Sequence, residues 1–206
     1  MPDNIRLIPR AALKGTATGL CLMSFFNLVW TGIAYGGLYS SNYWAVLLIF
    51  PAFCVVFIIN AIRLFRVAKY FPEITSPEDI AREKKTGMRF GIIFGAEGLL
   101  IFLGINIVVN LGHPELTVPV MALVVGLHFF PLARLFRRTI DYYLASYSTL
   151  VAIAAMVLSY YKYFNQNETL VFTGIGIAFA TSAYGVYMLA AGRKARAALK
   201  SNSKNT

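Results

Sequence analysis

Two ionisable residues, Glu97 and His128, stand alone within long apolar segments. Glu97 has isoleucine, phenylalanine and leucine as its near neighbours, and His128 lies in the segment Gly-Leu-His-Phe-Phe-Pro. Burial of an ionisable side chain in such surroundings is unfavourable unless the group is paired, hydrated or neutral. Each of the two residues is therefore a candidate for a functional role. A carboxyl and an imidazole placed together could exchange a proton or bind a small polar ligand.

Their positions in the chain predict that the two side chains meet. At about 1.5 Å per helical residue, Glu97 lies about 12 Å beyond Arg89, and His128 lies about 9 Å beyond Arg134. Their two segments are consecutive and would form one hairpin, so contact is plausible at this shared depth. Pro131 deprives the carbonyl four residues before it of a donor, which predicts a helix kink beside His128. Two interpretations stay open: a proton-coupling or ligand-binding pair, or a buried hydrogen bond that fixes helix packing.

Other side chains add little chemistry. Asn27 lies deep in the first apolar segment and is a candidate third member of the same pocket. Cys21 and Cys54 have no ligand spacing within a helix, so we predict neither a metal site nor a cofactor. The chain also has no phosphate-binding glycine loop, nucleophile elbow or zinc-protease motif, which makes an enzyme the least favoured class.

Glycines of the third apolar segment predict a helix-packing face. Close approach of helices in lipid relies on small residues, and four glycines fall within one narrow arc at helical spacing: Gly87, Gly91, Gly95 and Gly98. Glu97 points about 115° away from this arc and shares its face with Phe90 and Gly104. Two faces that both require protein neighbours would place this helix centrally in a bundle.

The composition is that of a multi-pass membrane protein. The chain has 206 residues, of which 58% are apolar and 14% are charged, against about 25% charged in soluble domains. Disorder is excluded, and two cysteines are too few for a disulfide-rich secreted fold. Because a spanning helix needs about 20 apolar residues, the sequence predicts an all-α polytopic bundle of six transmembrane helices in three hairpins: 15–39, 43–65, 88–110, 118–137, 140–163 and 168–191.

Basic residues predict the orientation of these helices. All the lysines and arginines except Lys162 fall in the N-terminal segment, the second and fourth connections, or the C-terminal tail. The positive-inside rule therefore places both termini in the cytoplasm. Topology and attraction to anionic lipid headgroups account for the net charge of +10, so no nucleic-acid partner is needed.

The rest of the chain predicts a single membrane domain over 1–206. Segment 67–86 is expected in the cytoplasm, with the third helix beginning near Pro77 after Ser76 as N-cap. The first apolar segment follows basic residues as a signal peptide would, but it lacks a small-residue cleavage site and is interpreted as a retained helix. The tail 201–206 is expected to be disordered.

The segment Gly-Leu-His-Phe-Phe-Pro-Leu-Ala at 126–133 resembles part of a family of small, uncharacterised bacterial multi-pass membrane proteins. These proteins carry a similar Gly-Leu-His-Phe-x-Pro-Leu-Ala segment in a late helix. The resemblance implies a bacterial inner-membrane location and draws attention to His128 and Pro131. It implies no activity.

Two functional hypotheses follow. The first is a small-solute or proton-linked transport or permeation protein that uses a pocket at Glu97 and His128. The second is a non-catalytic membrane partner, such as a lipid-interacting or sensory subunit, in which the same pair is structural. The sequence leaves open which solute is bound and whether the chain forms a homo-oligomer.

Overall fold

A computed structural model of the chain describes residues 9–39, 41–73 and 75–202. Within these residues all regular structure is helical, and six helices are long and apolar enough to cross a membrane. This confirms the all-α, multi-pass class. The elements, which include two short 3₁₀ turns, are α1 (Arg10–Leu38), η1 (Trp44–Leu48), α2 (Ile49–Ala68), α3 (Pro77–Asn110), η2 (Pro114–Leu116), α4 (Thr117–Phe136), α5 (Thr139–Tyr160) and α6 (Gln166–Asn202).

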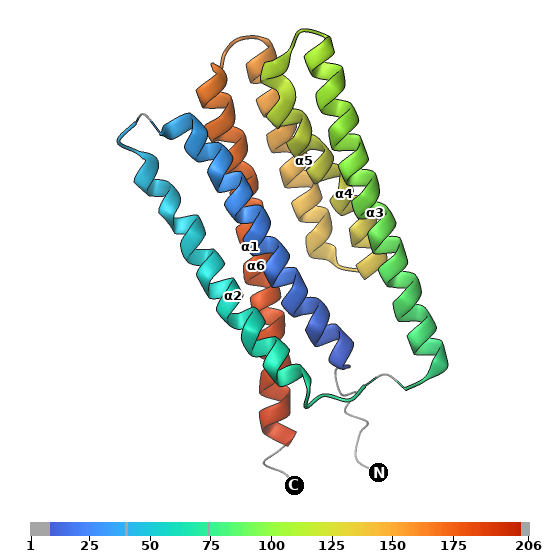
Figure 1. The fold of residues 1–206 in the computed structure, drawn as a ribbon. Coiled ribbons are helices and arrows are strands. Elements are labelled where there is room, and N and C mark those ends of the chain that lie inside the picture. The colour runs from blue at the N-terminus through green and yellow to red at the C-terminus, as the bar shows by residue number, and fades with distance from the viewer. Residues whose placement is uncertain (1–8, 40, 74, 203–206) are drawn as a thin grey trace.

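The helices run antiparallel as three hairpins (Figure 1). One end of the bundle, which we call the terminal face, holds the start of α1, the end of α6 and the α2–α3 segment. The α4–α5 turn points toward this end but lies about halfway along the bundle. The opposite end, the hairpin face, holds the connections within the three hairpins. On the terminal face the main-chain N–H of Arg10 donates to the carbonyl of Pro72 at 3.0 Å, and its side chain pairs with Glu73.

Helix ends agree with the sequence prediction in one case and differ in another. α3 begins at Pro77 with Glu78 and Asp79 in its first turn, although the Ser76 side chain makes no capping hydrogen bond. α6 continues to Asn202, so the first two residues of the tail expected to be disordered are helical. Residues 203–206 lie outside the described residues.

α6 is the most enclosed helix of the bundle, because it packs against α1, α2, α4 and α5. Its small residues permit this close approach. A Cβ atom added to Gly174 would lie 2.6 Å from the backbone nitrogen of Ala34 on α1, and one added to Gly185 would meet the ring of Phe57 on α2. Trp30 and Phe57, which are 2% and 0% exposed, fill the space between these helices.

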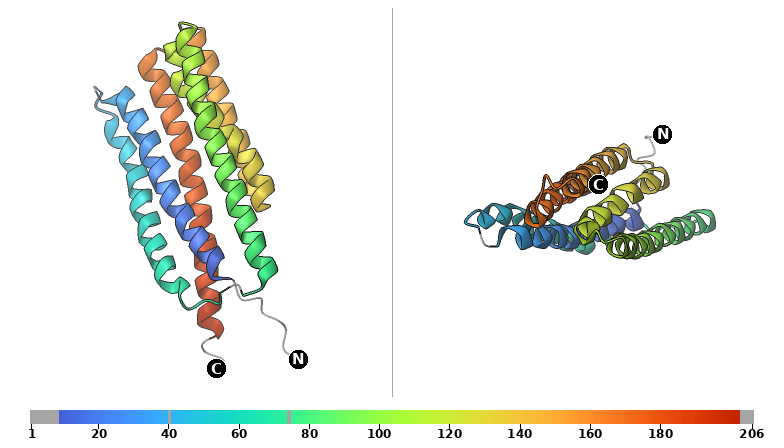
Figure 2. Two further views of the ribbon diagram at one scale, coloured as in Figure 1. Left: turned by 45° about the vertical axis from the view of Figure 1, so that its right-hand side comes forward. Right: turned by 90° about the horizontal axis from the view of Figure 1, so that it is seen from above.

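α3 lies at the edge of the bundle, which overturns its expected central position. α2 and α3 occupy opposite edges (Figure 2), and α3 packs mainly against α4. In the 18-residue apolar stretch by which α3 could cross a membrane, only 6% of the residues are buried. Its packed face is the one that carries Phe90 and Gly104, which meet Phe136 and Val120 of α4.

The glycine arc of α3 does not pack within the chain. The arc consists of Gly87, Gly91, Gly95 and Gly98. A Cβ atom added to any of these four glycines would have no heavy atom of the described residues within 4 Å. The described residues therefore offer these glycines no packing neighbour, and a helix that packs on them would have to come from another chain. A run of small residues marks a smooth helix face, but the larger residues of the neighbouring face, with Gly104 among them, make the contact with α4.

The orientation of the bundle can be tested by cysteine labelling. We expect Ser76→Cys on the terminal face to resist a membrane-impermeant maleimide added to intact cells, because the basic residues place this face in the cytoplasm. Asn42→Cys on the hairpin face should react, and the parent chain controls for Cys21 and Cys54. Both introduced residues replace exposed side chains. Labelling at residue 76 but not at residue 42 would reverse the topology.

Candidate functional site

Glu97 of α3 and His128 of α4 lie side by side in the described structure. The Nδ1 atom of His128 is 3.4 Å from Oε1 of Glu97, and their side chains are 11% and 7% exposed. This separation is an ion-pair distance, but the contact lacks the geometry of a hydrogen bond, and Oε2 of Glu97 has no partner among the described residues. The predicted proximity of the two groups is thus present in the structure.

Neighbouring contacts hold the two side chains at this position. Below Glu97, Phe90 stacks on Phe94 with ring centroids 5.7 Å apart, and Phe94 reaches Phe26 of α1 at 6.1 Å. The ring centroids of His128 and its chain neighbour Phe129 are 4.4 Å apart. Aromatic side chains therefore pack on α3 within one to two turns of Glu97 and on α4 next to His128.

α4 is fixed on its far side by α5. A Cβ atom added to Gly126 would lie 2.7 Å from the backbone nitrogen of Thr149, so the two backbones are in close contact two residues before His128. Pro131 lies inside α4, which continues as helix from Thr117 to Phe136. His128 is therefore presented to α3 by a helix that α5 holds in place.

Asn27 belongs to a different polar contact. It is fully buried, its Nδ2 atom donates to Oγ of Ser182 on α6 at 2.6 Å, and Thr31 donates to its main-chain oxygen at 2.7 Å. The bond to Ser182 joins α1 to α6, whereas Glu97 and His128 join α3 to α4. Among the described contacts, none links Asn27 to that pair.

Asp141 is a buried ionisable residue that the sequence analysis did not select. It lies in the first turn of α5 and is 0% exposed. Its position, one residue inside the predicted span 140–163, resembles that of ordinary charged residues at helix ends. The feature of the sequence that could have identified Asp141 is its carboxyl group, because an acidic residue within a predicted span requires a partner.

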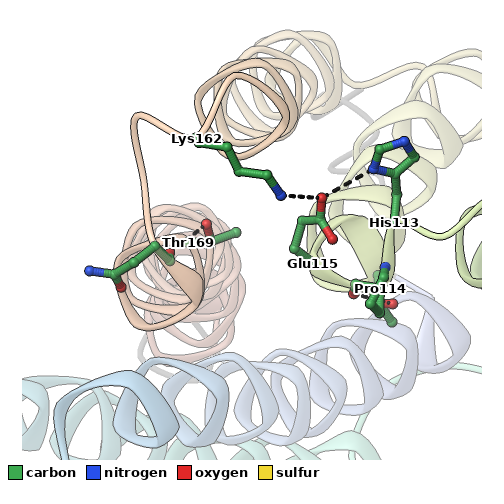
Figure 3. A network of polar contacts seen from close by, with 7 residues as sticks. His113, Pro114, Glu115, Lys162 and Thr169 are labelled. Carbon is green, nitrogen blue, oxygen red and sulfur yellow. Dashed lines mark hydrogen bonds and ion pairs between the residues drawn. The ribbon is translucent and has the colours of Figure 1, made fainter.

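The hairpin face holds a charged network around Glu115 (Figure 3). Its Oε1 atom accepts a hydrogen bond from Nζ of Lys162 at 2.8 Å and lies 3.2 Å from Nδ1 of His113. The network links the α3–α4 connection to the α5–α6 connection. Lys162, the one basic residue expected outside, is thus paired, and its left-handed backbone, with φ at 62°, forms the turn before α6.

A cavity of about 610 Å³ also opens on the hairpin face, between α1, α5 and α6. Apolar side chains such as Leu38, Val151 and Phe172 form much of its lining, and Asn165 and Glu168 contribute polar groups. These last two cap α6: Oδ1 of Asn165 accepts from the main-chain N–H of Glu168 at 3.0 Å, and Oε2 of Glu168 accepts from the main-chain N–H of Asn165 at 2.8 Å. The cavity does not include Glu97 or His128.

The described residues contain no group of three or more histidine, cysteine or acidic side chains that could hold a metal ion. No family model, curated protein or solved structure matches the chain. The resemblance of segment 126–133 therefore depends on its own residues, and the function must be argued from the site.

Proposed function

We propose that the chain carries protons across the membrane, alone or together with a small solute, and that Glu97 and His128 form the proton-carrying pair. The 3.4 Å contact between these two buried side chains is the observation that supports this proposal. Within the predicted span 88–110, Glu97 lies about 14 Å from the start, close to the middle of an apolar core about 30 Å thick.

The chemistry of the pair suits proton transfer. One proton can reside on the carboxyl or on the imidazole, which gives a neutral pair or an ion pair. Loss of that proton leaves a carboxylate beside a neutral ring, and gain of another leaves an imidazolium beside a neutral acid. Each change alters the net charge in apolar surroundings, where charge interactions are stronger than in water.

The position of α3 gives this charge change a structural consequence. α3 contacts the bundle mainly through α4, so few other contacts resist a shift of α3 relative to α4. Protonation of a pair located at this contact would therefore change the position of α3 more easily than that of any helix packed on several sides. Coupling of a proton to movement of one helix is the behaviour expected of a proton-linked carrier.

Flux measurements on proteoliposomes test this proposal. Vesicles that contain a pH-sensitive dye receive a panel of amino acids, sugars, sodium and potassium, each added outside. We expect at least one addition, or an imposed pH difference alone, to change the internal pH faster with the native chain than with Glu97→Gln. Asn106→Leu is the matched control, because Asn106 lies on the exposed face of the same helix. Equal rates for the native chain, Glu97→Gln and protein-free vesicles across the panel would contradict proton transport.

A second candidate is a non-catalytic membrane partner, and the exposed face of α3 favours it. This face combines the unpacked glycine arc with Asn106 and Asn110, whose amide groups bond only their own helix among the described contacts. Such a face could receive a helix of another chain or of a second copy. Silent flux assays combined with an intact fold in Glu97→Gln would favour this candidate. In either case, we place the protein in a bacterial inner membrane with its basic face toward anionic headgroups.

A further inference from the structure

Asp141 of α5 occupies a second buried polar site, in the first turn of α5 after the α4–α5 turn. The residue is 0% exposed, and neither carboxylate oxygen has a hydrogen-bond partner of normal geometry among the described residues. A buried carboxylate is far less favourable than an uncharged polar group unless it is paired and hydrogen-bonded. The site lies on α5 and α6, so it is separate from the Glu97–His128 contact between α3 and α4.

Two polar groups face this carboxyl. The hydroxyl of Tyr184, on α6, interacts with it and also accepts a hydrogen bond from Nη1 of Arg138 at 3.2 Å. Arg138 is the N-cap residue of α5 and follows Arg137, whose left-handed backbone ends α4. Among the described titratable groups, only these two act on Asp141. Tyr184 belongs to an apolar cluster that also contains Leu144 of α5 and Phe129 of α4, and the ring centroids of Phe129 and Tyr184 are 5.9 Å apart.

We propose that Asp141 is a proton-binding site beside the α4–α5 turn, with Tyr184 bridging it to Arg138. A metal cation is a poor alternative, because the described residues offer no cluster of three ligating side chains and the Arg138 guanidinium already supplies a positive charge. The cavity on the hairpin face does not include Asp141 in its lining. A proton needs neither space nor further ligands.

The arrangement allows the proton to be exchanged with water. Asp141 is two residues from the first residue of α5, or about 3 Å along the helix axis. Exchange would therefore require movement only of Arg138 and of this first turn, next to the α4–α5 connection. The Tyr184 oxygen, already an acceptor for Arg138, can donate its O–H to the carboxylate or accept the O–H of the protonated acid. The phenol thus serves both protonation states without a change of partner.

Infrared difference spectroscopy of the purified full chain in lipid nanodiscs, titrated with pH, tests this assignment. We expect a carbonyl band of a protonated carboxylic acid that appears on acidification and is lost in Asp141→Asn. Tyr184→Phe should keep the band and move its frequency, because the hydroxyl that contacts the acid is removed. The Glu97→Gln variant should retain the band, so the outcome does not depend on the function proposed for Glu97 and His128.

Isotope labelling keeps the test valid if Asp141→Asn does not fold. The chain has three aspartates, Asp3, Asp79 and Asp141, and Asp79 is exposed. Carboxyl-¹³C aspartate should therefore shift the band in the native chain, and labelled glutamate should leave it in place. Above about pH 6, an ordinary aspartate with a pKa of about 3.9 is ionised and gives no protonated-acid band. A native spectrum in which aspartate labelling moves no such band between about pH 6 and 9 would show that Asp141 is an ionised partner of Arg138 in that range.

Discussion

Gly174→Ala should destabilise the bundle strongly, whereas Gly91→Ala should leave its stability unchanged or slightly higher. The added methyl group at residue 174 would lie 2.6 Å from the backbone nitrogen of Ala34 and 2.8 Å from the carbonyl oxygen of Trp30. Neither backbone atom can move without separating α1 from α6. Overpacking of this kind typically costs about 1–3 kcal/mol, and occasionally more.

The Gly91 variant is the matched control, because it makes the same chemical change on an exposed helix face. No heavy atom of the described residues lies within 4 Å of the added methyl group. Thermal unfolding of the purified variants in one detergent, together with the yield of monodisperse protein, measures both effects. A melting temperature that falls equally in the two variants would mean that the glycine arc of α3 is packed against another chain, since this chain offers it no neighbour.

Features that depend on distance along the chain could be predicted from the sequence. Apolar length locates the six helices, and Pro77 with the acidic residues after it locates the start of α3. The contact of Glu97 with His128 was predicted in the same way, because consecutive antiparallel helices place residues of equal depth opposite each other. Depth is a one-dimensional quantity, and hydropathy determines it well.

The lateral arrangement of the helices could not be predicted in this way. Lipid tails are as apolar as leucine, so a lipid-facing helix surface and a packed one can have the same hydropathy. For this reason the glycine arc of α3 was assigned to packing, although α3 lies at the edge of the bundle. The bond from Asn27 to Ser182, 155 positions apart in the chain, depends on the same arrangement.

The burial of Asp141 is a second feature that the sequence does not predict. A carboxyl near a predicted helix end is compatible with an exposed, helix-stabilising role in the first turn. Asp141 is nevertheless 0% exposed, because α5 packs against α4 and against α6, whose Tyr184 is 43 positions later in the chain. Sequence proximity to the membrane boundary therefore says little about whether a side chain is exposed to water.

Glu97→Gln and His128→Gln should be coupled in their effects on stability. Each substitution removes one member of a contact of 3.4 Å and leaves the other buried without its partner. The double variant should therefore be less destabilised than the sum of the two single variants. Residues in direct contact typically show interaction energies of about 0.5–3 kcal/mol. Unfolding measurements on the four proteins at one pH determine this energy.

A control cycle separates direct contact from a general weakening of α3. Asn106→Leu changes the exposed face of α3, where the amide of Asn106 bonds only the carbonyl of Phe102 at 2.7 Å among the described contacts. Combined with His128→Gln, it should be additive within about 0.5 kcal/mol. Additivity in both cycles would place Glu97 and His128 beside different neighbours.

Repetition of the main cycle across pH distinguishes the two roles considered for the pair. If Glu97 and His128 carry a proton, the native chain changes its protonation in the working pH range and the interaction energy changes with it. If the pair only fixes the packing of α3 on α4, the same proton stays in place and the interaction energy is the same at each pH. We expect a pH-dependent interaction energy. An interaction energy that stays constant with pH would show that the contact is structural and that Glu97 and His128 do not carry the proton.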